Sequence, residues 1–90
     1  MLEGERQNLK KLTGSRDGII LVIHGKRHGE GIEKITHKFS EIIHSQLHTH
    51  LANQKCLDLF IVTGDGEDIV DLAEKLQKAK NVEIVKVVAP

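Results

Sequence analysis

Four segments of the chain have the lengths and hydrophobic patterns of β-strands. Gly18–His24 is a short apolar run rich in β-branched residues, which is typical of a strand in the middle of a sheet. In Leu47–Leu51 and Cys56–Thr63 the side chains alternate between two faces, and Val82–Val88 is a further apolar segment near the C-terminus. The short polar connection at 53–55 predicts that the second and third strands form an antiparallel hairpin.

The segment from Ile32 to about Ser45 has the periodicity of an amphipathic helix. Its apolar residues recur at helical spacings and would form one buried stripe, made of Ile32, Ile35, Phe39, Ile42 and Ile43. His37, Glu41 and His44 fall on the opposite side of such a helix. We therefore expect this helix to bury one face and to present a histidine-bearing face outward.

A second helix is predicted between the third and fourth strands. Gly64-Asp65-Gly66 would end the strand, with Asp65 as the N-cap residue of the helix. Lysines crowd its last turns, where positive charge suits the helix dipole, and Asn81 is a plausible stop. The expected buried stripe consists of Ile69, Leu72, Ala73 and Leu76.

The resulting order of elements, β-α-β-β-α-β, is that of the ferredoxin-like fold, which belongs to the α+β class. Two helices would cover one face of a four-stranded antiparallel sheet and leave the other face open for a partner. We expect residues 18–90 to form this domain. The polar and charged residues 1–17 are expected to be a flexible tail or linker.

Composition excludes several classes of protein. The chain has 90 residues, and its 13 Lys+Arg balance 13 Asp+Glu, which argues against direct DNA binding. Two Phe residues, without Trp or Tyr, argue against a base-stacking platform. No apolar run is long enough to span a membrane. A single Cys cannot form an internal disulfide, which suggests a cytoplasmic protein. A domain this small is marginal alone, so oligomerisation or a bound metal would stabilise it.

The pattern His48-x-His50-x5-Cys56 is the strongest chemical signal in the chain. Residues two apart in a strand point to one face, about 6.5 to 7 Å apart along the chain. If the hairpin places His50 opposite Cys56, two imidazoles and one thiol converge on one point. Such donors suit nickel, copper, zinc or cobalt. The alternative is that the histidines are solvated and Cys56 is a small buried residue.

A fourth ligand is needed to complete such a site. His37 and His44 are the candidates, but both are expected on the outward side of the first helix. From there neither could easily reach the open sheet face of its own chain. A fourth histidine would therefore come from another subunit, and the metal would hold the subunits together.

The segment from His37 to Cys56 resembles the regulatory domain of the nickel-responsive transcriptional regulators. The matching features are a His eleven residues before His48, then His48-x-His50, Cys56 and the Gly64-Asp65 turn. The resemblance extends over roughly residues 18–88 and implies an ACT-type fold. It also implies a nickel site at a tetramer interface, in which His48, His50 and Cys56 of one chain are joined by His37 of another.

Two departures from the family pattern change what we expect. Position 58 is Asp where the family usually has Glu, and Asp58 is a candidate for orienting a histidine ligand. The family carries an N-terminal ribbon-helix-helix DNA-binding domain, whereas only about seventeen residues precede the first expected strand here. We therefore do not expect direct DNA binding from this chain alone.

The sequence thus predicts a nickel-binding sensor or regulatory domain. A nickel store, a metallochaperone or an ACT-type module that binds an amino acid are the alternatives, and zinc or copper could replace nickel. An enzyme is not expected, because four protein ligands leave no open position on the metal. Metal binding should weaken as the pH falls through the ordinary imidazole pKa of about 6.5, since protons compete for the same nitrogens.

Overall fold

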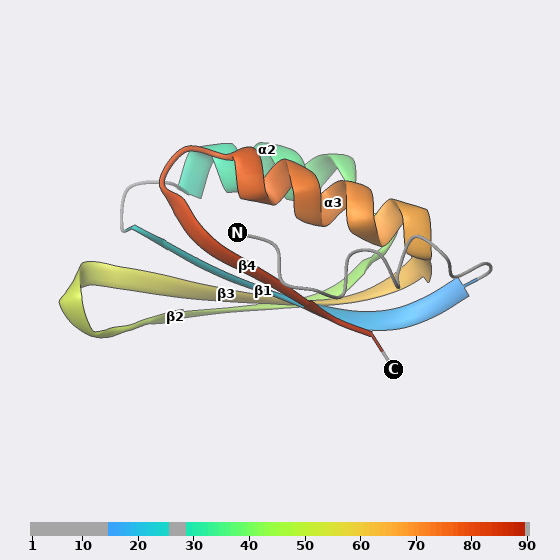
Figure 1. Cartoon of the computed structure of the whole chain (residues 1–90), viewed down its shortest axis with the longest axis horizontal. Helices are drawn as coiled ribbons and strands as arrows, with labels where there is room; N and C mark the ends of the chain where they lie inside the picture. Colours follow the sequence, from blue (N-terminus) through green and yellow to red (C-terminus); the bar gives the residue numbers. More distant parts are fainter. Residues whose placement is uncertain (1–14, 26–28, 90) are drawn as a thin grey trace.

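The computed structural model of the protein describes residues 15–25 and 29–89. Its secondary-structure elements follow the predicted order along the chain (Figure 1). They are β1 (Ser15–Gly25), α2 (Gly29–Lys38), β2 (Ile43–His50), the short 3-10 helix η1 (Ala52–Gln54), β3 (Lys55–Asp65), α3 (Gly66–Lys78) and β4 (Val82–Val88).

The four strands form one antiparallel sheet in the order β2-β3-β1-β4. Figure 1 shows α2 and α3 together on one face of this sheet, and neither of these two described helices covers the other face. The architecture confirms the predicted α+β, ferredoxin-like fold. Neither helix in this part of the chain is long and apolar enough to cross a membrane.

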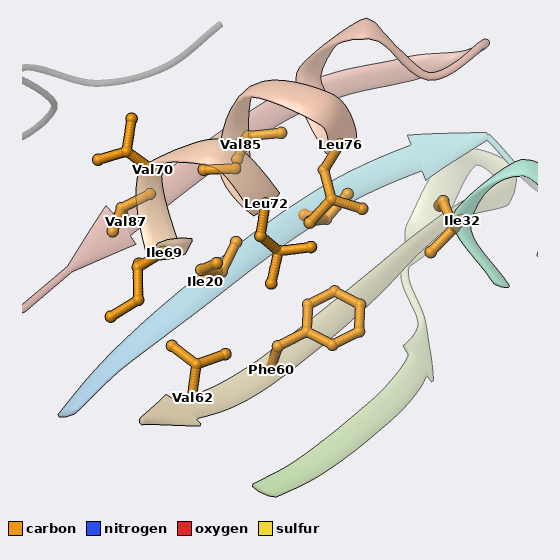
Figure 2. Close-up of a cluster of buried hydrophobic side chains, with 12 residues drawn as sticks. Ile20, Ile32, Phe60, Val62, Ile69, Val70, Leu72, Leu76, Val85 and Val87 are labelled. Carbon is orange, nitrogen blue, oxygen red and sulfur yellow. The ribbon is translucent and has the colours of Figure 1, made fainter. Parts of the chain in front are cut away.

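The hydrophobic core lies between the helices and the sheet (Figure 2). Every second residue of the two central strands faces the helices, and α3 contributes the stripe that its periodicity predicted. The fully buried side chains include Ile20, Val22, Phe60, Val62, Ile69, Leu72 and Leu76. This core is aliphatic apart from Phe60, as the composition requires.

The first helix is shorter than the sequence predicts. It ends at Lys38, and a turn follows in which the Ser40 amide donates to His37 and the Ile42 amide donates to Phe39. Ile42 then accepts a hydrogen bond from the amide of Thr63 as the chain joins the sheet. Ile42 and Ile43 still pack against the core. Their place in the periodic stripe therefore correctly predicts that they pack against the core. The prediction that they belong to the helix is wrong.

The second strand consequently begins at Ile43 and not at Leu47. His44, expected on the outer face of the helix, lies instead on this strand. The sequence between Ile43 and Gln46 does not itself favour a strand strongly. Pairing with the complementary edge of β3, where Leu47 faces Leu59, decides its conformation.

The first strand begins three residues before Gly18, because Ser15–Asp17 pair with Thr63–Asp65 of β3. Part of the expected tail therefore belongs to the sheet, while residues 1–14 lie outside the described part of the chain. The other boundaries agree better. The second helix begins directly after Asp65, although the Asp65 side chain makes no capping hydrogen bond, and the last strand has its predicted bounds.

Candidate metal site

The hairpin of β2 and β3 extends beyond the end of the helical layer (Figure 1). Asn53 and Gln54 adopt positive φ angles of 62° and 61° in its turn, and the Leu51 amide donates to the carbonyl of Lys55 at 2.8 Å. This closure fixes the pairing of the strands. His50 lies opposite Cys56 and His48 opposite Asp58, so the predicted hairpin register is the observed one.

His48, His50 and Cys56, which we call the hairpin triad, come together at this end of the sheet. One donor atom from each lies within 4.8 Å of the others. The Nδ1 atom of His50 is 3.6 Å from the sulfur of Cys56, which is only 2% exposed, whereas both histidines are exposed. Metal–ligand bonds of about 2.0 to 2.3 Å need only small rotations from this arrangement.

The hairpin triad lies on the helix-covered side of the sheet, so the sequence-based expectation that it faces the open side is wrong. Cys56 and Asp58 have the same orientation in β3 as the core residues Phe60 and Val62. The triad is nevertheless accessible through its histidines, because the hairpin extends past the helices. The buried sulfur therefore lies at the edge of the core, beside two exposed imidazoles.

Asp58 forms a buried carboxylate bridge between two histidines. Its Oδ1 atom is 2.5 Å from Nδ1 of His48, and its Oδ2 atom is 2.7 Å from Nε2 of His24. Asp58 is 3% exposed and His24 is 2% exposed. Asp58 thus contacts one of the predicted histidine ligands, His48, as its expected orienting role requires.

His24 is not among the site residues that the sequence predicts. The available signal was alternation along the first strand, which places His24 on the same face as Ile20 and Val22. The register then sets His24 opposite Cys56. Alternation alone thus indicates that His24 is buried, while its place beside the predicted sulfur ligand depends on the pairing of β1 with β3.

His37 is not brought to the hairpin triad of its own chain. It is exposed on α2. The described residues contain two groups of metal-compatible donors, the hairpin triad and the group of His24, His48 and Asp58, and neither includes His37. It borders a surface hollow of about 240 Å³ that is lined by Glu33, Thr36, His37, Ser40, Ile43 and Gln46. His44 is also exposed and belongs to neither donor group. Within one chain the structure thus gathers three of the four predicted ligands.

Sequence comparison places this geometry in a family. The model of the family described as "NikR C terminal nickel binding domain" matches residues 18–89. A candidate nickel-responsive regulator of Methanocaldococcus jannaschii is 37% identical over 81 residues, which cover 87% of this chain and 57% of the relative. A second such regulator, from Methanothrix thermoacetophila, is 32% identical over 81 residues, which cover 87% of this chain and 58% of the relative. The chain therefore spans a little over half the length of these curated relatives.

Solved structures with low sequence identity share the fold. An uncharacterised protein from Thermotoga maritima superposes with a TM-score of 0.76 at 22% identity, covering 84% of this chain and 98% of that one. The ACT domain of the GTP pyrophosphokinase of Chlorobium tepidum superposes with a TM-score of 0.64 at 16% identity. The superposition covers 83% of this chain and 100% of the ACT domain. These likenesses confirm the ACT-type architecture. The match of the family model over residues 18–89 shows that this chain belongs to the family of NikR C-terminal nickel-binding domains.

Proposed function

We propose that the hairpin triad binds Ni²⁺, that His37 of a second copy of the chain completes the site, and that metal binding serves a regulatory function. The observation that carries this proposal is the convergence of His48, His50 and Cys56 within 4.8 Å. Imidazole nitrogen together with thiolate sulfur is a donor set that suits nickel. Membership of a nickel-binding family favours nickel over zinc or copper, which the same donors could hold.

Each residue of the site has a distinct task in this proposal. Cys56 supplies the sulfur from a buried position, so the thiol is shielded from bulk water. Asp58 accepts a hydrogen bond from Nδ1 of His48, which leaves Nε2 of that ring to face a metal. Because a free thiol is needed as a ligand, we further propose that the protein acts in the reducing cytoplasm.

The position of His37 supports a site shared between subunits. Its side chain is exposed on α2, outside the donor groups of its own chain, and beside a hollow that a second molecule could enter. A ligand contributed by a second chain would link the metal directly to assembly. The metal could then favour one arrangement of subunits, because it binds that arrangement more tightly.

The open face of the sheet supports self-association independently. It exposes a group of aliphatic side chains across all four strands, namely Ile19, Leu47, Ile61, Ile84 and Val88, with exposed fractions between 38% and 60%. Burying such a patch would add stability that a domain of this size lacks. We propose a homotetramer, in which one contact uses this face and another uses the metal sites.

Metal titration of the purified protein tests the proposal. Metal-free protein is dialysed against nickel, and bound metal is quantified while absorption is followed for a nickel–thiolate charge-transfer band. We expect one nickel ion for each chain in the wild-type protein. His48→Ala and Cys56→Ala should each lose tight binding, and Cys56→Ala should also lose the band.

His44→Ala provides the matched control, because His44 is an exposed histidine on the same strand outside the triad. It should bind nickel as the wild type does. Unchanged nickel binding by the double variant His48→Ala/Cys56→Ala would contradict the assigned site. Stabilisation by an amino acid, without any response to nickel, would favour the alternative function of an ACT-type small-molecule sensor.

A further inference from the structure

His24 is fully enclosed where β1 ends, and both nitrogens of its ring are hydrogen-bonded. Nδ1 lies 2.7 Å from the carbonyl oxygen of Gly25, and Nε2 lies 2.7 Å from Oδ2 of Asp58. A carbonyl oxygen can only accept, so Nδ1 of His24 is the donor in the first contact. The contact with Gly25 thereby fixes the ring orientation and directs Nε2 at the carboxylate.

The second contact determines what the other carboxylate oxygen can do. One proton lies between Nε2 of His24 and Oδ2 of Asp58, whichever of the two atoms carries it. Oδ1 therefore has only lone pairs to offer, and Nδ1 of His48 must donate to it across 2.5 Å. His48 is then the Nδ1–H tautomer, and its Nε2 atom keeps a free lone pair.

We propose that His24 is a positioning residue for the metal site. It holds the Asp58 carboxylate in the rotation that keeps His48 in the Nδ1–H tautomer, with Nε2 available to nickel. The tautomer itself follows from the three side chains, while its use in metal binding depends on the proposed function. This assignment adds to the site a buried residue that acts on the proposed ligand His48 through Asp58.

The burial of the group explains why His24 is required. The side chain of His48 is 46% exposed, so water competes for its ring nitrogens and its single hydrogen bond to Asp58 is easily exchanged. The bond between His24 and Asp58 is shielded, because the two side chains are 3% and 5% exposed. Without His24, the buried carboxylate would lose the partner that fixes its rotation.

The arrangement of the rings is consistent with this role. The ring centroids of His24 and His48 are 6.0 Å apart, and those of His48 and His50 are 5.3 Å apart with nearly perpendicular planes. His48 thus lies between a buried ring that acts through Asp58 and an exposed ring of the triad. A change in its orientation would disturb the geometry on both sides.

The proposal is tested on metal-free protein by NMR of histidines labelled with ¹⁵N. Long-range ¹H–¹⁵N correlation at about pH 8, where ordinary exposed imidazoles are neutral, reads the tautomer of each ring directly. The wild-type spectrum should show the proton of His48 on Nδ1. A proton on Nε2 in the wild type would overturn the proposal without any substitution being made.

Two substitutions test the part played by His24. In His24→Leu the proton of His48 should move mainly to Nε2, the tautomer that free imidazole side chains prefer in water. In His24→Gln, whose amide can still donate to Asp58, Nδ1–H should persist. Should the leucine variant fail to fold, His24→Phe keeps an aromatic ring without nitrogens and has the same expected result. His44→Leu is the control for loss of an uninvolved histidine.

Nickel affinity separates this proposal from the proposed function. In His24→Leu it should fall about 10- to 100-fold, as is usual when a group that orients a ligand is removed. A His48 tautomer that stays on Nδ1 in His24→Leu overturns the positioning role, whatever the protein binds. A wild-type protein that shows the expected tautomer but takes up no nickel contradicts the proposed function instead.

Discussion

His50 and Cys56 lie directly opposite each other in the β2–β3 hairpin, with Nδ1 of the histidine 3.6 Å from the sulfur of the cysteine. Only five residues separate them in sequence, so a single turn determines whether the two donors meet. A slip of one residue would move every side chain of the strand to the other face of the sheet. The geometry of the site therefore depends on the turn at Ala52–Gln54.

The turn offers a first prediction, because Gln54 has a φ angle of 61°. This conformation is strained for a residue with a β-carbon, whereas glycine adopts it without that penalty. Gln54→Gly should therefore raise the free energy of unfolding by up to about 1 kcal/mol. Gln54→Val should lower it, since β-branched side chains fit this region least. Urea denaturation measures both, and a stabilising valine would contradict the argument.

A second prediction concerns the close contact between Gly64 and Ile42. A β-carbon at position 64 would lie 2.7 Å from Cγ2 and 3.2 Å from Cβ of Ile42, closer than atoms can pack without movement. Gly64→Ala should thus destabilise the protein by about 1 to 3 kcal/mol through overpacking. The same change made in an Ile42→Ala background would test whether this contact is the cause, because alanine lacks Cγ2 and Gly64→Ala should cost less stability there.

Gly31 is the matched control, because it lies exposed on α2 and a β-carbon there would meet no atom within 4 Å. Gly31→Ala should stabilise the protein by about 0.5 to 1 kcal/mol, as alanine favours the helix. Opposite signs at positions 31 and 64 are expected in thermal denaturation. Equal effects would mean that steric contact with Ile42 is not what distinguishes the two sites.

A third prediction links the core to the metal. Phe60 is completely buried and lies two residues from Asp58 on the same face of β3. Phe60→Ala should cost about 3 to 5 kcal/mol, a large part of the stability of a domain this size. Nickel at a hundred times its dissociation constant should restore about 2.7 kcal/mol. Melting curves with and without nickel check this, and His48→Ala in the same background should abolish the recovery.

The sequence is sufficient to predict the fold and most of the hairpin site, because both follow from local patterns. Alternation in β3 puts Cys56 and Asp58 on one face, and the short connection sets His50 against Cys56. The end of the first helix could not be predicted in the same way. Ile42 has the spacing of a helical core residue, yet it reaches the core from a turn. Periodicity reports burial, and tertiary pairing decides the backbone conformation that achieves it.

The remaining parts of the site depend on contacts between distant segments. His24 meets Asp58 only because β1 lies beside β3, a neighbour relationship that alternation within one strand does not reveal. The sequence also predicts the wrong face of the sheet for the hairpin triad, and the reason is related. The β2–β3 hairpin extends past the ends of the helices. Residues on the helical side of the sheet are therefore covered along most of these strands and accessible at the hairpin end.

A fourth prediction concerns the open face of the sheet. Ile61 is 44% exposed there, and a charge at its position would prevent a second copy from burying the patch. Ile61→Asp should therefore reduce the mass of the assembly measured by light scattering, while the circular dichroism of the chain is unchanged. Glu67→Lys, a charge change on the exposed side of α3, should leave the mass as it is. An Ile61→Asp protein with wild-type mass would exclude this face from the interface.

A final prediction tests whether the metal site is shared, using two variants that should each fail alone. A His37→Ala chain keeps the hairpin triad, and a Cys56→Ala chain keeps His37, so neither forms a complete site with its own kind. After unfolding and refolding together, about a quarter of the sites should regain tight nickel binding, since half of the chains carry an intact triad and half an intact His37. The charge-transfer band should return in the same proportion. If His37 served the triad of its own chain, mixing would restore nothing, because every chain would still lack one ligand.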